Sequence, residues 1–140
     1  MLLKEADSLR KVPLFAKLEP SKLKLLAFTS ESLTYEDKEV IFEEGDAADA
    51  AFVIMEGEVE ILADTGAGRV VVGVLGKDEL FGELAVLNNS TRSATLRAKG
   101  HLRALRIEGD KFITLLTENN SFALSVIRQL SAKLARAIPR

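Results

Sequence analysis

The chain has 140 residues, enough for one domain with a buried core and too few for a second full module. With 47% hydrophobic and 29% charged residues it has the composition of an ordinary folded protein, which excludes a disordered or fibrous chain. A formal net charge of −2 gives no overall positive field for nucleic acid or anionic lipid, and the absence of cysteine excludes disulfides and thiolate chemistry.

The first residues and the apolar runs of the sequence indicate the cellular compartment of the protein. Charged residues fall where a secretory signal needs an apolar core (Met1-Leu-Leu-Lys-Glu-Ala-Asp7), and no apolar run is long enough to span a bilayer. We therefore expect a cytoplasmic protein without direct membrane or nucleic-acid partners.

Helical patterning marks the first segment, from residue 1 to about residue 30. Pro13 and Pro20 interrupt the pattern, and Glu19–Lys22 suits the start of a helix because proline is tolerated in the first turn. We predict two short helices joined by a turn. The apolar residues at helical spacing are Leu2, Leu3, Ala6, Leu9, Leu23, Leu25 and Leu26.

Between residues 31 and 108 the pattern changes to short runs typical of strands. Val59 and Ile61 alternate with Glu58 and Glu60, so one face is apolar and the other charged. Several such runs separated by turn signals predict an antiparallel β-barrel or jelly roll, with a hairpin turn at residues 64–68. The predicted strands are 39–42, 51–55, 58–62, 69–75, 93–97 and 102–107.

The helical period returns in the last part of the chain, over about residues 110–138. Helices are predicted at Lys111–Thr117 and Ser121–Ile138, with Asp110 and Ser121 as N-caps. The expected architecture is therefore a single domain over residues 1–140, mainly β with flanking α-helices. The apolar stripe of the last helix comprises Phe122, Val126, Leu130 and Leu134, with Ala123, Ile127 and Ala137 beside it.

The segment Phe81–Ala94 carries the most distinctive chemistry. Gly82 permits close approach of the backbone to a ligand, and Glu83–Leu87 can begin a short helix whose first N–H groups lack intrahelical partners. Arg92 offers a planar fork of donors for phosphate oxygens, whereas Glu83 is an acceptor suited to a hydroxyl. This combination is typical of a nucleotide site, although the two residues taken alone favour a solvated ion pair without a ligand.

The residues around this pair add a family resemblance. Gly82-Glu83-Leu84-Ala85 followed by Arg92-Ser93-Ala94 resembles the phosphate-binding cassette of the cyclic nucleotide-binding domain family, found in catabolite activator proteins, protein kinase regulatory subunits and gated channels. Gly45-Asp46 with Phe52–Gly57 resembles the family's early strand-turn-strand signature, and Pro13–Phe15 its N-terminal helical segment. The resemblance extends over roughly residues 14–136.

The resemblance implies a role for each residue of the cassette. Glu83 would receive the ribose 2′-hydroxyl, Arg92 would pair with the cyclic phosphate, and Gly82 would let the ribose come close. The backbone N–H groups that complete the phosphate cradle would belong to Leu84, Ala85 and Ser93.

A base and ribose wall is implied less specifically. Ile61, Val72 and Gly73 resemble the family's apolar wall, but barrel core explains the three residues equally well. The Ser93 hydroxyl suits a phosphate oxygen, the amino group of a guanine, or no ligand at all, so it leaves the base undecided.

The last helix bears on how the base is covered. If Pro139 terminates it, the base lid is short, missing or supplied by another chain. Arg128, Lys133 and Arg136 could reach a base, but cations in the second half of a helix are also favoured by the helix dipole.

Three other features of the sequence are interpreted as structural and not as ligand sites. A single histidine, His101, cannot build the multi-histidine metal site of a jelly-roll cupin enzyme, and we expect it on the surface. The acidic group at residues 43–49 lacks the ligand spacing of an EF-hand and is interpreted as a solvated turn. Gly66 and Gly68 lie between strands without the lysine of a P-loop, so they indicate a hairpin.

We therefore expect a receptor domain without enzymatic activity, cofactor or metal. Its ligand would be a 3′,5′-cyclic nucleotide, with cAMP favoured over cGMP, and its C-terminal helix would relay occupancy to a homodimer partner or an effector domain. The alternatives are a ligand-free scaffold or dimerisation module of the same fold, the sensor fragment of a longer transcription regulator, and a cupin-like metalloenzyme.

Overall fold

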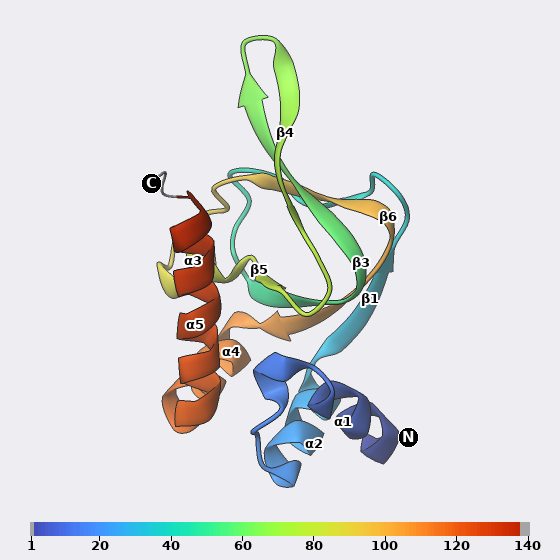
Figure 1. The fold of residues 1–140 in the computed structure, drawn as a ribbon, viewed down its shortest axis with the longest axis vertical. Coiled ribbons are helices and arrows are strands. Elements are labelled where there is room, and N and C mark those ends of the chain that lie inside the picture. Colours follow the sequence, from blue (N-terminus) through green and yellow to red (C-terminus); the bar gives the residue numbers. More distant parts are fainter. Residues whose placement is uncertain (1, 138–140) are drawn as a thin grey trace. The chain divides into compact units, whose positions relative to one another are not determined.

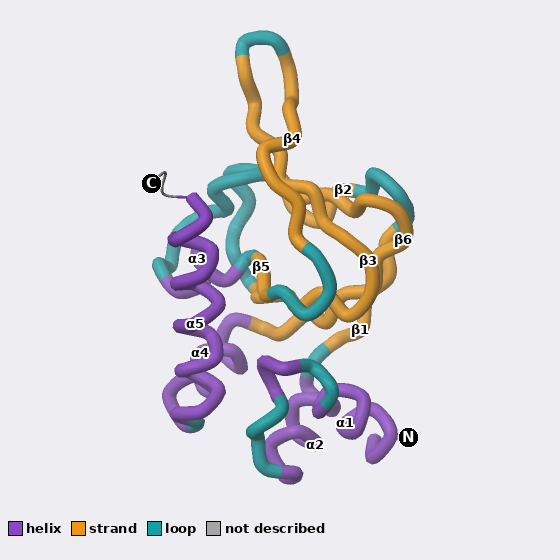
Figure 2. The backbone as a smooth tube through the Cα atoms, in the orientation of Figure 1, coloured by secondary structure: helices purple, strands orange, loops and turns teal. Residues whose placement is uncertain are grey.

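The computed structural model describes residues 2–137 and divides the chain into two compact units. One unit comprises Met1–Thr29 with Asp110–Arg140, and the other comprises Ser30–Gly109. The first is helical and the second is built on a β-sheet (Figure 1 and Figure 2). None of the described helices is both long and apolar enough to cross a membrane.

The helical unit is held by aromatic packing. The ring of Phe122 stacks on Phe15 with centroids 5.9 Å apart and meets Phe112 edge-on at 5.9 Å, and all three side chains are fully buried or nearly so. The predicted helices at both ends are confirmed, with a short 3₁₀ turn between the first two. They are α1 (Leu2–Arg10), η1 (Pro13–Phe15), α2 (Pro20–Thr29), α4 (Gly109–Glu118) and α5 (Asn120–Ala137).

Two details of the C-terminal helices differ from the prediction. Because α4 begins at Gly109 and α5 at Asn120, Asp110 and Ser121 lie inside the first turns and are not the N-caps. The predicted stripe of α5 is buried only in part, since Phe122 and Val126 are buried whereas Leu134 is 62% exposed. The predicted end of the last helix at residue 138, and Pro139, lie outside the described residues.

The sheet unit contains six antiparallel strands in an open arrangement. The main order is β1-β6-β3-β4, while β2 pairs with β6 and β5 with β3. The antiparallel β fold with flanking helices is confirmed, but the described strands do not close into a barrel. The strands are β1 (Glu31–Tyr35), β2 (Val40–Phe42), β3 (Ala50–Thr65), β4 (Gly68–Leu75), β5 (Leu80–Phe81) and β6 (Thr95–Glu108), and α3 (Glu83–Leu87) lies between β5 and β6.

Two predicted strand breaks are bulges within single long strands. Gly57 has a φ of +97° and Gly100 a φ of +72°, values that favour glycine, yet pairing of β3 with β6 continues on both sides of them. The predicted strands 51–55 and 58–62 therefore belong to β3, and 93–97 and 102–107 belong largely to β6. Both strands are irregular at the same level of the ladder, and they remain paired on either side of it.

The hairpin between β3 and β4 is confirmed. Its two strands pair from Val59↔Leu75 to Thr65↔Gly68, and it forms the narrow loop at the top of Figure 1. β1 was not predicted as a strand, because most of its side chains are polar. In the structure none of them is buried. It forms because its backbone pairs with β6 from Glu31↔Arg106 to Tyr35↔Leu102.

We predict that Gly57→Ala destabilises the protein. A methyl group at Gly57 would meet the backbone carbonyl of His101, and the positive φ would strain any side chain. Equilibrium unfolding in urea should show a loss of about 1 to 3 kcal/mol or more. The matched control is Gly66→Ala, where nothing lies within 4 Å of the added methyl group, and equal stability of the two variants would contradict the prediction.

Candidate functional site

The start of α3 is shaped by Gly82. This residue adopts a left-handed conformation (φ 74°, ψ 5°) at the N-cap position, directly after β5. A Cβ atom there would lie 2.9 Å from Nη1 of Arg92 and 3.2 Å from the ring of Phe42. Glycine at this position is therefore required by backbone conformation and by the packing of Arg92, whatever else approaches it.

Arg92 is a buried cation, with 3% of the residue exposed. Its Nη1 donates to the carbonyl of Gly82 at 2.6 Å and its Nη2 donates to the carbonyl of Ala50 at 2.7 Å. Nε has no hydrogen-bond partner among the described residues. Burial without full hydrogen bonding is costly for a guanidinium, and the Nε–H group remains an unused donor.

Aromatic rings support the guanidinium from one side. Cζ of Arg92 lies 4.1 Å from the ring centroid of Phe42 and 5.9 Å from that of Phe52. Phe52 in turn stacks on Phe81 with centroids 5.0 Å apart. Since Phe42, Phe52 and Phe81 come from β2, β3 and β5, three strands fix the position of one charged side chain.

The backbone of Arg92 is fixed as firmly as its side chain. Its N–H donates to the carbonyl of Asp46 at 2.9 Å, and its carbonyl accepts from the N–H of Gly45 at 2.8 Å. Ala47 forms a β-bridge with Thr91 beside them. The turn predicted to be merely solvated therefore also anchors the segment that carries Arg92.

Charged neighbours adjust the electrostatics of Arg92. Asp49 Oδ1 lies 3.9 Å from Nη2 of Arg92, and Asp49 Oδ2 accepts from Nη2 of Arg106 at 3.0 Å. Burial lowers the pKa of Arg92, whereas the charges of Asp49, Asp46 and Glu83 oppose that shift. The guanidinium stays charged at neutral pH. The sequence did not indicate that Asp49 is a partner of Arg92, because the acidic group at residues 43–49 does not show which cation each carboxylate contacts.

Glu83 is also buried, with 2% of the residue exposed, at the first position of α3. The alternative of a solvent-exposed Glu83–Arg92 ion pair is therefore wrong, because neither side chain is on the surface. Of the other residues predicted in the cassette, Ala85 is buried, while Leu84 and Ser93 are exposed. The structure thus brings Gly82, Glu83 and Arg92 together.

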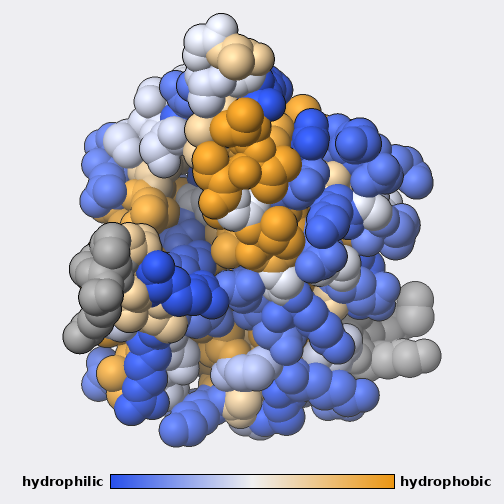
Figure 3. Space-filling model, turned by 45° about the horizontal axis from the view of Figure 1, so that its top comes forward, coloured by the Kyte–Doolittle hydropathy of each residue, from blue (hydrophilic) through white to orange (hydrophobic). Residues whose placement is uncertain are grey.

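The residues predicted to form a base and ribose wall, Ile61, Val72 and Gly73, lie on the β3–β4 hairpin. Ile61 faces Gly73 as its direct partner, and a Cβ at Gly73 would lie 3.3 Å from Cδ1 of Ile61. Ile61 packs against the core of the sheet unit, but Val72 is 61% exposed, so barrel core does not explain Val72. Figure 3 shows apolar side chains gathered on the surface below the hairpin tip. The other exposed valines of β4 are Val70, Val71 and Val74.

A cavity of about 380 Å³ opens beside Arg92. Sites for small organic ligands usually enclose about 300 to 1,000 Å³, so this cavity is of suitable size. Its lining combines two arginines, two aspartates and several aromatic or aliphatic side chains: Leu33, Tyr35, Ile41, Phe42, Asp46, Ala47, Asp49, Phe52, Arg92 and Arg106.

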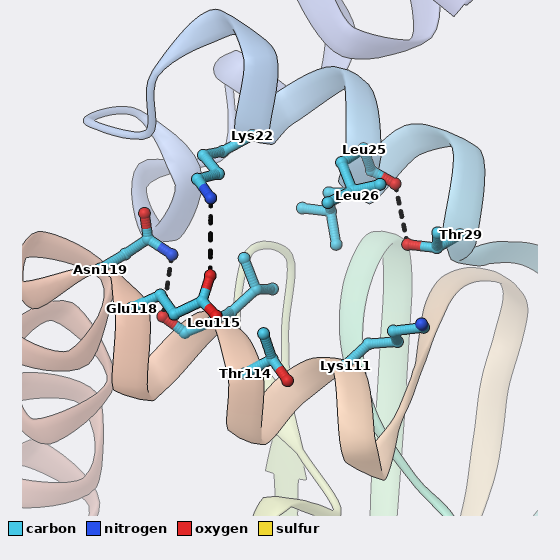
Figure 4. Close-up of a pocket in the computed structure, with 9 residues that line it drawn as sticks. All are labelled: Lys22, Leu25, Leu26, Thr29, Lys111, Thr114, Leu115, Glu118 and Asn119. Atoms are coloured by element: carbon cyan, nitrogen blue, oxygen red, sulfur yellow. Dashed lines mark hydrogen bonds and ion pairs between the residues drawn. The ribbon is translucent and has the colours of Figure 1, made fainter.

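A second hollow lies within the helical unit, between α2 and α4 (Figure 4). It encloses about 130 Å³, below the range of nucleotide-sized sites. Leu26 and Leu115 line it, and an ion pair of 3.6 Å between Lys22 and Glu118 crosses its edge. In the described part of the chain, no cluster of three or more histidine, cysteine or acidic residues is arranged to hold a metal ion.

Comparison with known proteins establishes the family. The family model of the cyclic nucleotide-binding domain matches residues 32–119, which include the sheet unit apart from its first two residues, and all of α3 and α4. The chain therefore belongs to the cyclic nucleotide-binding domain family.

Named relatives and solved structures agree with this assignment. The chain is 35% identical over 109 residues to a cAMP-dependent protein kinase regulatory subunit of Blastocladiella emersonii, covering 77% of this chain and 27% of the relative. The catabolite activator protein of Thermus thermophilus matches with a TM-score of 0.74 at 26% identity, over 89% of this chain and 59% of that one. A cAMP-binding acyltransferase from Mycobacterium smegmatis matches with a TM-score of 0.83 at 25% identity, over 96% and 42%.

The chain covers only part of each of these relatives. The chain spans about a quarter of the kinase regulatory subunit, 59% of the catabolite activator protein and 42% of the acyltransferase. The shared part is a cyclic nucleotide-binding regulatory domain, which occurs in these relatives beside other segments.

Tyr35, in the lining of the cavity beside Arg92, has a raised pKa. Burial raises it most, the negative charge of Glu39 adds to the increase, and the charge of Arg106 opposes it. Because the folded state disfavours the phenolate, the phenol's contribution to stability is complete below about pH 10 and is lost as the pH rises further.

We predict that the Tyr35 phenol titrates with a midpoint above its ordinary value near 10 in the folded protein. The chain has one tyrosine and no tryptophan, so tyrosinate absorbance reports this group alone. Glu39→Gln should bring the midpoint down, because it removes a neighbouring negative charge. A midpoint in the folded protein no higher than that of the urea-unfolded chain would contradict the prediction.

Proposed function

We propose that this chain is a receptor domain for a 3′,5′-cyclic nucleotide and that cAMP is preferred over cGMP. The observation that carries the proposal is Arg92, a buried guanidinium with an unpartnered Nε inside the segment that matches the family. The preference for cAMP is supported by relatives named as cAMP-dependent kinase regulatory subunits.

The proposed binding mode assigns a task to each residue of the cassette. Arg92 pairs with the cyclic phosphate through charge-assisted hydrogen bonds, and buried Glu83 accepts from the ribose 2′-hydroxyl. Gly82, at the start of α3, leaves room beside both. The N–H groups assigned to the phosphate cradle are those of Leu84, Ala85 and Ser93.

The wall of the site is proposed on the hairpin. Exposed Val72 and half-buried Ile61 supply apolar surface for the nucleotide, and Gly73 keeps that surface shallow because it has no side chain. Burial of apolar surface by a base would stabilise the complex by about 25 cal/mol per Å². We expect binding without catalysis, cofactor or metal.

We further propose that ligand occupancy changes the position of α5. The support is the character of this helix: Leu124, Ile127 and Leu134 are 45%, 57% and 62% exposed, so they offer an apolar face to an effector or a second copy of the chain. A ligand shifts the helix only if it binds one helix position more tightly than another.

The same exposed face supports a second candidate function, a docking module of this fold that binds no nucleotide. The two functions differ in one measurable property, the affinity for cyclic nucleotide, so titration separates them.

We expect isothermal titration of the full chain to show binding of cAMP, and weaker binding of cGMP. Arg92→Ala and Glu83→Ala should each lose about 1.5 to 3 kcal/mol or more, which is roughly tenfold to a hundredfold in affinity, because each removes a contact made to the ligand. Arg92→Lys keeps the charge without the planar fork and should bind with intermediate affinity.

The control for these variants is Arg103→Gln, because Arg103 lies on β6 and forms an exposed ion pair with Glu56 of β3. Melting temperatures show whether each variant is folded. If neither nucleotide produces heat or raises the melting temperature of the unaltered chain, the receptor function is wrong and the docking module becomes the leading function.

We expect cAMP to change the distance between α5 and the sheet unit. The chain has no cysteine, so Ala132→Cys on α5 and Lys99→Cys on β6, both at exposed positions, allow paired spin labels to be attached. Saturating cAMP should shift the distance distribution measured by double electron–electron resonance, and Arg92→Ala should abolish the shift. An unchanged distribution in a chain shown to bind cAMP would refute the relay.

A further inference from the structure

A row of four charges leads from the surface of the sheet unit to Arg92. Nη1 of Arg106 lies 3.1 Å from Oε1 of Glu31, and Nη2 of Arg106 lies 3.0 Å from Oδ2 of Asp49. The other carboxylate oxygen of Asp49, Oδ1, lies 3.9 Å from Nη2 of Arg92. The carboxylate of Asp49 is therefore shared by two arginines, and it is closer to Arg106.

Strand pairing fixes this arrangement. Glu31 and Arg106 are direct partners in the β1–β6 ladder, and Ala50, the residue after Asp49, pairs with Glu108 on the same strand. The N–H of Gly109 also donates to the carbonyl of Asp49 at 2.9 Å. The Arg106 side chain is only 20% exposed, whereas those of Asp49 and Glu31 are 71% and 60% exposed, so Arg106 is the most buried of these three side chains and contacts two exposed carboxylates.

The distance between Asp49 and Arg92 matters for anion binding. A carboxylate in direct contact with a guanidinium occupies its donors and neutralises the charge that a phosphate would meet. Nη2 of Arg92, the nitrogen nearest Asp49, already donates to the carbonyl of Ala50. A closer approach of Asp49 would compete for the same guanidinium edge.

Arg106 also acts directly on the field at Arg92. Its positive charge lowers the pKa of Arg92, which places the two cations within electrostatic reach of each other. Both arginines line the cavity beside Phe42. Loss of Arg106 would therefore release Asp49 toward Arg92 and remove a positive charge at the same time.

We propose that Arg106 is a positioning residue of the nucleotide site: by holding Asp49 away from Arg92, it keeps the Arg92 guanidinium available to the ligand phosphate. This inference rests on the proposed function. It assigns a role in binding to a residue on β6, outside the segment Phe81–Ala94 that contacts the ligand.

The test is titration of the full chain with cAMP at low and high salt. Arg106→Gln should weaken binding by roughly three- to tenfold, the size of one lost polar interaction. Arg106→Lys should recover part of the affinity, because lysine keeps the charge but cannot bridge Glu31 and Asp49 with a planar fork. Arg103→Gln, three residues earlier on β6, breaks a similar ion pair of 3.0 Å with Glu56 and should bind within about twofold of the unaltered chain.

A double-mutant cycle separates positioning from a general loss of stability. In an Asp49→Asn background, where no carboxylate can close on Arg92, Arg106→Gln should weaken the binding of cAMP clearly less than it does in the unaltered chain, because only the direct effect of the lost positive charge remains. The weakening caused by Arg106→Gln alone should also shrink at high salt, which screens charges.

Two outcomes would overturn the inference while the proposed function stands. One is a dissociation constant for Arg106→Gln within twofold of the unaltered chain, and the other is the same weakening with and without Asp49. Absence of cAMP and cGMP binding by the unaltered chain would instead reject the proposed function and this inference with it. If Arg106→Gln fails to fold, two other variants decide the test. The inference would be overturned if a folded Arg106→Ala variant bound cAMP with the affinity of the unaltered chain. It would also be overturned if Arg106→Lys bound cAMP as tightly as the unaltered chain.

Discussion

A buried guanidinium is the constraint on which the rest of the sheet unit depends. Removing a charge from water costs several kcal/mol unless hydrogen bonds and counter-charges replace the lost hydration. Arg92 recovers part of that cost from the carbonyls of Gly82 and Ala50 and from the face of Phe42. Because Nε has no partner among the described residues, the recovery is incomplete, and this unused donor supports the proposed role of Arg92 in ligand binding.

Much of the surrounding backbone can be understood as support for that side chain. Gly45 and Asp46 hold the main chain of Arg92, while β2, β3 and β5 supply the aromatic rings around it. The long β3–β6 ladder then places Asp49 and Arg106 at one end, and Val72 lies on β4 beside the other end of the ladder. One sheet thus positions both the buried charge of Arg92 and the exposed apolar side chains of β4, the two surfaces to which the proposed nucleotide site is assigned.

The sequence predicted local features better than their assembly. The helices at both ends and the hairpin at residues 64–68 were predicted, and Glu83 and Arg92 were recognised within one segment, because each feature depends on neighbours close in sequence. Gly57 and Gly100 were interpreted as strand breaks, since a glycine with positive φ looks the same in a turn and in a bulge until the partner strand is known. β1 was missed because pairing with β6, and not its own composition, makes it a strand.

By itself, the sequence determined the mainly β fold with flanking helices, and it supplied the cassette residues that are proposed to bind the ligand, because periodicity and a short motif are properties of contiguous chain. Only the tertiary structure decided that Glu83 and Arg92 are buried, that Phe42 and Ala50 hold the guanidinium, and that Asp49 is shared with Arg106. These partners lie about 14 to 50 residues from Arg92 along the chain or on separate strands, and strand register, which no local pattern encodes, sets their distances.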